Sequence, residues 1–134
     1  MTPLHPDLIH KLQSWPTRAV QHAHVIRALF LQTAQDIDAY NLEESLKWGE
    51  PAWRPKKGGT TLRVAWSTKS PDELGLFVDC KSDLCARMQW DFPSTFRFVA
   101  PRAMYLQLDR NVPETAITQL AQMAFRYKRV IPKH

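Results

Sequence analysis

The sequence predicts one α+β domain, spanning residues 1–134, in which about five antiparallel strands pack against helices from both ends of the chain. Three observations lead to this prediction. Apolar residues recur at helical spacing near both ends, residues in the middle alternate between apolar and polar, and the strand-like runs are not interleaved with long helices. A chain of 134 residues is long enough to bury its own hydrophobic core.

Two helices are expected at the N-terminal end. Residues 6–13 place Leu8, Ile9 and Leu12 on one side of a short helix. A longer helix is expected over residues 17–35, because its apolar side chains recur at spacings of three and four and form a stripe that faces a core.

Four alternating runs predict strands. Residues 60–66 and 73–79 are separated by a short polar turn, so we expect them to form an antiparallel hairpin. Residues 94–100 and 103–109 alternate in the same way on either side of Pro101. These four runs supply most of the predicted sheet.

The rest of the chain completes this order. Residues 82–90 fit either a short helix or a loop. A closing helix is expected over residues 113–128, with an acidic residue in its first turn and basic residues near its end, as the helix dipole favours.

The most distinctive stretch is residues 43–53, EESLKWGEPAW, in which Trp48 and Trp53 flank a glycine and a proline. Gly49 permits backbone conformations that other residues resist, and Pro51 fixes its own φ angle. Together they predict a sharp turn into an edge-like segment that ends at Trp53. Two interpretations remain open: both indoles pack in the core, or one lines a pocket and offers its N–H to a ligand.

A non-catalytic binding or interaction module is the function that remains after elimination. The sequence contains no nucleophile elbow, zinc-protease, phosphate-loop or dinucleotide fingerprint, so we expect no catalytic residues. We expect at least one of the two indoles to be accessible beside a groove for a small ligand, a partner's peptide or a second copy of the chain in a homodimer. The candidate ligand-binding residues are Trp48, Glu50, Trp53 and Tyr40.

The same stretch resembles the YdhG-like family of small bacterial proteins, also called the domain-of-unknown-function 1801 family. The strands at 60–66 and 74–79 and the sequence AFRYK at 124–128 add to the likeness, which covers most of the chain. Residues 80–95 depart from the family pattern, in which this connection tends to be shorter and to contain glycine. The resemblance implies an α+β domain with a curved antiparallel sheet. Some members are described as frataxin-like intracellular iron chaperones, so it also implies iron as a ligand.

The acidic block at residues 36–50 supplies the carboxylates that iron prefers. The candidate metal ligands are Asp36, Asp38, Glu43 and Glu44. A loop is needed to bring the first two together, because residues two apart on a helix point away from each other. The alternative is a solvated connector. The net charge of +5 opposes a surface that gathers cations.

Single-stranded nucleic acid is a further candidate partner, and a less favoured one. Residues 51–69 carry five bases and no acid, between or beside the aromatic residues Trp53 and Trp66. Phosphate contacts next to a stacking platform suit a single strand. The candidate residues are Arg54, Lys56, Lys57 and Arg63. The alternative is a solubilising hairpin tip, and no established nucleic-acid-binding motif is present.

The sequence predicts a cytoplasmic protein. It contains no apolar run of about 18 residues, as a membrane span requires, and its first residues lack the pattern of a signal peptide. We expect Cys80 and Cys85 to be free thiols, because a reducing compartment disfavours a bridge and two cysteines are too few for a zinc site.

Overall fold

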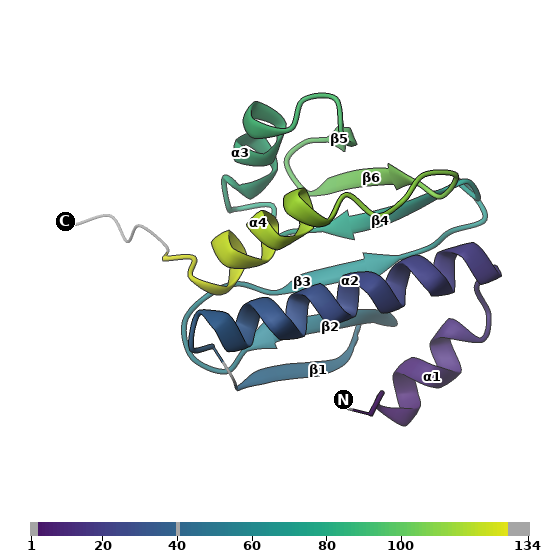
Figure 1. The fold of residues 1–134 in the computed structure, drawn as a ribbon, viewed down its shortest axis with the longest axis horizontal. Helices are drawn as coiled ribbons and strands as arrows, with labels where there is room; N and C mark the ends of the chain where they lie inside the picture. The colour runs from purple at the N-terminus through teal and green to yellow at the C-terminus, as the bar shows by residue number, and fades with distance from the viewer. Residues whose placement is uncertain (1–2, 40, 129–134) are drawn as a thin grey trace.

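The computed structural model describes residues 3–39 and 41–128 and confirms the α+β class with an open antiparallel sheet (Figure 1). The sheet has the strand order β1-β2-β3-β4-β6-β5, and every neighbouring pair is antiparallel. The elements in chain order are α1 (Pro6–Leu12), α2 (Thr17–Asp36), β1 (Leu42–Lys47), β2 (Glu50–Pro55), β3 (Leu62–Ala65), β4 (Glu73–Phe77), α3 (Leu84–Asp91), β5 (Arg97–Val99), β6 (Ala103–Gln107) and α4 (Glu114–Phe125).

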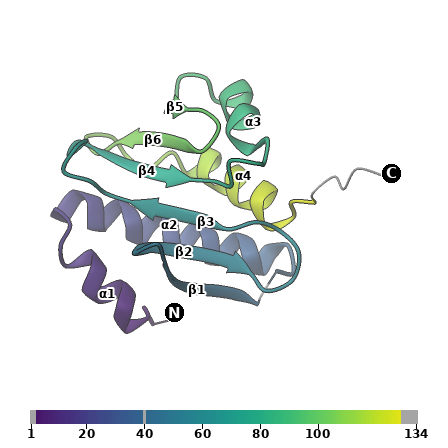
Figure 2. The same ribbon diagram turned by 180° about the vertical axis from the view of Figure 1, so that it is seen from behind.

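The helices are distributed unevenly over the sheet. α2 and α4 lie side by side across one face, α1 lies beside β1 and β2, and α3 lies beside α4 at the other end (Figure 1). Seen from behind, the strands stand in front of α2 and α4 (Figure 2). No helix among the described residues covers the centre of that second face, which we call the open face. Among the described residues, no helix is both long enough and apolar enough to cross a membrane.

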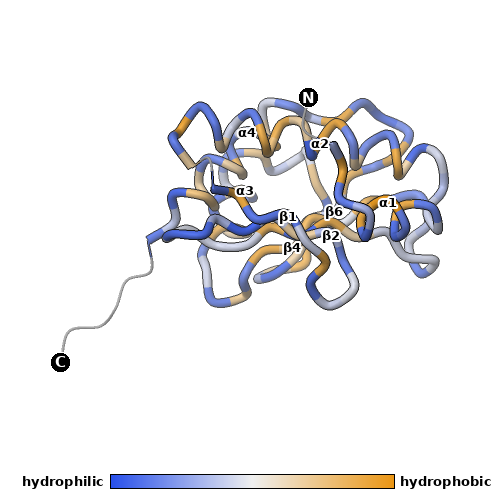
Figure 3. Tube along the Cα trace, turned by 90° about the horizontal axis from the view of Figure 1, so that it is seen from below, coloured by the Kyte–Doolittle hydropathy of each residue, from blue (hydrophilic) through white to orange (hydrophobic). Residues whose placement is uncertain are grey.

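The hydrophobic core fills the space between α2, α4 and the sheet, where hydrophobic positions of both layers meet (Figure 3). Leu62 and Val64 of β3 and Leu74 and Leu76 of β4 are fully buried in it. The intervening residues of these strands therefore point to the open face, since successive side chains alternate across a sheet. The predicted hairpin and its inward face are confirmed.

The structure has six strands where the sequence predicted about five. The additional strand is β1, whose LEESLK sequence resembles a charged connector more than a strand. β1 is an edge strand paired only with β2 in the described chain, and all six of its residues are at least partly exposed. Charged side chains are common on such edges because they discourage pairing with other chains. Over residues 82–90 the structure decides for a helix, α3.

Candidate functional site

The two tryptophans of the distinctive stretch have opposite environments. Trp53, on β2, is 2% exposed and packs its ring against Phe30 of α2, with 5.2 Å between ring centroids. Its Nε1–H donates a hydrogen bond to Glu44 Oε2 at 2.7 Å, so it is not available to a ligand. Trp48 is 82% exposed. The expectation that one of the two indoles is accessible is confirmed, and it is Trp48.

Trp48 and Gly49 form the turn of the β1–β2 hairpin. The cross-strand pairing of Lys47 with Glu50 leaves these two residues as the whole loop, and their φ angles are +55° and +74°. Positive φ at both positions defines a type I′ turn, for which Asn-Gly is the favoured sequence. A bulky residue such as tryptophan is rarely found in this backbone conformation. Pro51 lies within β2 and takes no part in the turn.

A hollow of about 510 Å³ opens beside this turn. It lies between Trp48, the loop over residues 56–61 and the residues that follow β4, and we call it the basic hollow. Arg63 contributes from the open face of the sheet, since its neighbour Leu62 points into the core. Asp79 is the only acidic residue among the described lining. Its five basic lining residues are Lys47, Arg54, Lys56, Arg63 and Arg102.

Two of these bases already have carboxylate partners. Arg63 Nη1 lies 2.9 Å from Glu50 Oε1, and Arg54 Nη2 lies 3.5 Å from Glu43 Oε2. In the described part of the chain, no acidic side chain forms an ion pair with the three others, which are Lys47, Lys56 and Arg102. The hollow is therefore a concentration of positive charge that suits an anion.

Glu50 forms an ion pair with one of these bases, Arg63, at the edge of the hollow. Burial raises the pKa of its carboxyl group, and the nearby Arg63 and Lys11 partly oppose that effect. The ionised form of Glu50 is thus poorly solvated and relies on the guanidinium of Arg63. Any anion that binds Arg63 competes with Glu50 for the same group.

Backbone hydrogen bonds hold both ends of the loop over residues 56–61. The Lys56 N–H donates to Asn41 O at 3.0 Å, and the Thr60 N–H donates to Ala124 O at 2.8 Å. Gly59 lies against the end of α4 with a φ of +64°, and a Cβ there would come within 2.7 Å of Phe125 O. The backbone of the loop is therefore held in place, including the point from which the Lys56 side chain extends. Lys57 belongs to the same loop but does not line the hollow.

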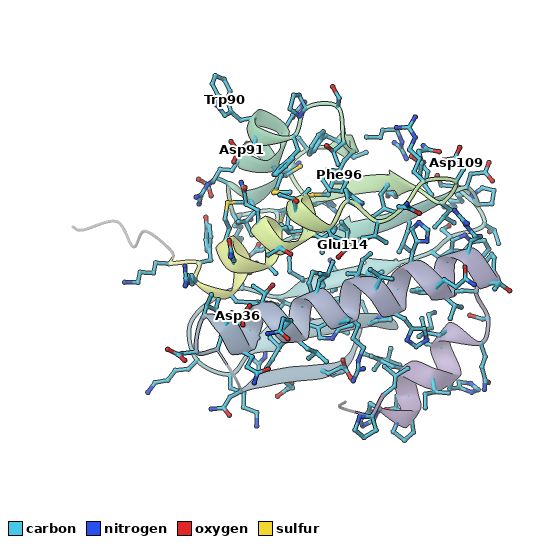
Figure 4. All side chains as sticks on the ribbon, in the orientation of Figure 1. Asp36, Trp90, Asp91, Phe96, Asp109 and Glu114 are labelled. Carbon is cyan, nitrogen blue, oxygen red and sulfur yellow. The ribbon has the colours of Figure 1, made fainter. Side chains whose placement is uncertain are left out.

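The structure does not bring the four candidate metal ligands together. Glu44 faces the core side, where its carboxylate receives Arg27 Nε at 2.6 Å and Nη2 at 3.0 Å as well as Trp53 Nε1. Glu43 faces the opposite side, and Asp36 ends α2 (Figure 4). Within residues 3–39 and 41–128, no three His, Cys, Asp or Glu side chains are grouped as a metal ion would need.

The remaining candidates are Tyr40, the two cysteines and Trp53 as a stacking residue. Tyr40 lies outside the described residues. Cys80 and Cys85 are both free thiols; Cys80 is exposed on the wall of the hollow, whereas burial raises the pKa of the Cys85 thiol. Trp53 is buried and cannot serve as the stacking platform suggested for a single strand.

Sequence reasoning missed Lys47 and Arg102 as members of the site. Lys47 reaches the hollow because it ends β1, a strand that the sequence did not predict. Arg102 precedes β6, which lies next to β4 although α3 and β5 separate them in the chain. No short-range pattern signals that neighbourhood.

Comparison of the chain with protein-family models, with curated proteins and with solved structures found no match. The likeness to the YdhG-like family therefore stays a prediction from the residues themselves.

Two glycines of the loop allow a test of its anchoring. Gly58 and Gly59 have similar φ angles of +69° and +64°, but a Cβ at Gly58 would meet nothing within 4 Å. We expect Gly58→Ala to lower the free energy of unfolding by about 1 kcal/mol through backbone strain alone. Gly59→Ala should cost at least about 1 kcal/mol more, because its methyl group overlaps the backbone of α4. Urea unfolding measures both values, and equal losses would contradict the anchoring role of Gly59.

Proposed function

We propose that this chain is a non-catalytic binding module whose basic hollow holds a phosphate-bearing ligand with a flat ring. The observation that carries the proposal is Trp48, an exposed indole in a strained turn beside three bases without an ion-pair partner in the described chain. Lysine and arginine side chains suit phosphate oxygens, and an indole face suits a planar ring.

The backbone of Trp48 supports a role in binding. A residue other than glycine in the left-handed region costs roughly 1–3 kcal/mol, and such residues cluster at binding sites. With 82% of its surface exposed, Trp48 gains little from burial in the core that would offset this cost. A ligand that stacks on the indole would give the residue a function at this position.

The described lining of the hollow favours binding over catalysis. It contains no histidine, and its single carboxylate, Asp79, accepts a hydrogen bond from the Lys81 backbone N–H at 2.9 Å. The lining therefore lacks both a histidine and a pair of carboxylates, which are the groups that general acid–base catalysis uses most often.

Two finer proposals accompany this function. The stretch at 43–53 builds the hairpin at the rim of the hollow, which supports membership of the YdhG-like family with a ligand site at its characteristic motif. We also propose a cytoplasmic location. The exposed free thiol of Cys80 supports it, since such thiols persist most readily in a reducing compartment.

Isothermal titration calorimetry with pyrophosphate at low salt tests the proposed charge recognition. We expect the wild type to bind and the variant Lys56→Ala/Arg102→Ala to lose about tenfold or more in affinity, because two charge-assisted contacts are removed. The matched control Lys69→Ala/Arg110→Ala removes the same charge away from the hollow. No binding by the wild type, or equal losses in both variants, would overturn the proposal.

Glu50→Gln should strengthen the binding of pyrophosphate by roughly two- to tenfold, because it removes the negative charge that competes for Arg63. Burial raises the pKa of Glu50, so lowering the pH should narrow the difference in affinity between the wild type and Glu50→Gln, because Glu50 loses its charge in the wild type. Glu114→Gln, at the start of α4 across the sheet, is the control for net charge (Figure 4). Unchanged affinity in Glu50→Gln would count against a role for Arg63.

Trp48→Asn separates the turn from the ligand. We expect the free energy of unfolding to rise by about 1 kcal/mol, because Asn-Gly is the preferred type I′ sequence. Affinity for adenosine diphosphate should fall roughly five- to tenfold through lost stacking, while affinity for pyrophosphate stays unchanged. Trp90→Asn is the control, since Trp90 is 87% exposed but projects from α3 (Figure 4). Unchanged affinity for the nucleotide in Trp48→Asn would leave the indole without a ligand role.

A further inference from the structure

A line of cationic and aromatic side chains crosses the open face of the sheet next to the basic hollow. Its four members come from four adjacent strands, and we call it the open-face strip. Arg63 of β3 is paired with Phe77 of β4, and Tyr105 of β6 is paired with Arg97 of β5. Figure 2 shows these four strands side by side.

The side chains of the strip contact one another in sequence. The rings of Phe77 and Tyr105 are arranged edge to face, with 6.0 Å between centroids and 80° between planes. Arg63 Cζ lies 5.6 Å from the Phe77 centroid, and Arg97 Cζ lies 4.3 Å from the Tyr105 centroid. Both rings are only partly buried. The strip therefore presents a run of π-surface and guanidinium planes.

Small residues leave room around these rings. Gly75 is paired with Tyr105, Ala65 lies beside Gly75, and Ala103 is paired with Phe77. A Cβ at Gly75 would come within 2.8 Å of Phe77 Cε2 and 3.0 Å of Tyr105 Cε1, so the two rings close over this glycine. None of the three small neighbours rises high enough to screen the rings from a planar group laid across them.

Carboxylates hold both arginines of the strip in place. Arg97 donates from Nε to Glu73 Oε2 at 3.0 Å and from Nη2 to Glu73 Oε1 at 2.8 Å, and Arg63 binds Glu50. The hydrogen bonds from Arg97 lower the pKa of Glu73, so this carboxylate stays ionised and keeps its partner. A guanidinium held in this way loses little conformational freedom when a ring stacks on it.

We infer that the ligand of the basic hollow is a single-stranded nucleic acid, with its phosphates in the hollow and its bases on the open-face strip. This inference rests on the proposed function and names its ligand class. Arg63 joins the two regions, because it lines the hollow and also lies over Phe77. Proteins recognise single strands by stacking unpaired bases on aromatic rings or arginine planes beside a positively charged groove. An acidic peptide would match the charge of the hollow, but its carboxylates have no ring face to stack on the strip.

Fluorescence anisotropy with the wild-type chain tests the role of the bases. The probes are a labelled oligothymidine of about eight nucleotides, within the usual site sizes, and an abasic oligonucleotide with the same number of phosphates. We expect oligothymidine to bind at least about fivefold more tightly, because stacking adds to the phosphate contacts. Both affinities should fall as salt rises.

Each result has a distinct consequence. Equal affinity for the two oligonucleotides would overturn the inference and leave the proposed function intact, provided that pyrophosphate and adenosine diphosphate bind. Absence of oligonucleotide binding in a chain that binds pyrophosphate would overturn it as well. If pyrophosphate also fails to bind, the proposed function itself is wrong. If polyglutamate at comparable concentration displaces oligothymidine, the ligand is an acidic peptide and the inference is wrong.

Substitutions that keep an apolar side chain but remove the ring test whether the bases lie on the strip. We expect Phe77→Leu and Tyr105→Leu each to lower affinity for oligothymidine by at least about fivefold and to leave affinity for the abasic probe unchanged. Phe98→Leu is the matched control, because Phe98 is a partly buried ring of β5 that packs against the core side. Urea unfolding verifies that each variant is folded at the temperature of the titration. Equal losses in Phe98→Leu, or parallel losses for the abasic probe, would overturn the inference.

Discussion

The type I′ turn at Trp48 and Gly49 is the constraint on which the rest of the site depends. A two-residue turn fixes the register of β1 against β2, so that Glu44 lies opposite Trp53 and faces the core with it. A shift of the register by one residue would exchange the two faces of β1. It would expose the Glu44 carboxylate, which accepts hydrogen bonds from both Arg27 and the Trp53 indole. The same turn places the Trp48 side chain outside the core, at the rim of the hollow. One local backbone conformation thus determines both the anchor of the hairpin and the side chain offered to a ligand.

The core side of that hairpin provides the rigidity that a binding surface needs. Arg27 of α2 and Trp53 of β2 both donate to the carboxylate of Glu44, whose side chain is only 13% exposed. Removing one member of such a poorly hydrated charge pair destabilises the fold, because the other charge is left buried alone. The intact pair is tolerated when every polar atom has a hydrogen-bond partner, and that condition is met here. Edge-to-face packing of Trp53 on Phe30 adds an apolar contact between the same two elements. The hairpin is therefore joined to α2 by polar and apolar contacts at once, although β1 is an edge strand.

The sequence predicts the fold class because each helical stripe and each alternating run identifies the buried face of a single helix or strand. The core positions of β3 and β4 follow directly from that alternation. β1 was not predicted, because an edge strand buries too little surface to impose an apolar pattern. The basic loop was recognised from composition, whereas Arg102 and the pairing of Gly75 with Tyr105 arise from the adjacency of β4 and β6, which is a property of the whole sheet. The sequence thus predicts that at least one of Trp48 and Trp53 is accessible, and only the strand register shows that Trp48 faces outward.

The Glu50–Arg63 pair links the two regions of the open face through a single guanidinium. Arg63 binds a partly buried carboxylate on one side and lies over the Phe77 ring on the other. A phosphate that binds Arg63 weakens its bond to Glu50, and the raised pKa of Glu50 makes proton uptake the natural response to that loss. Charge recognition and ring stacking are therefore coupled, because both use the guanidinium of Arg63.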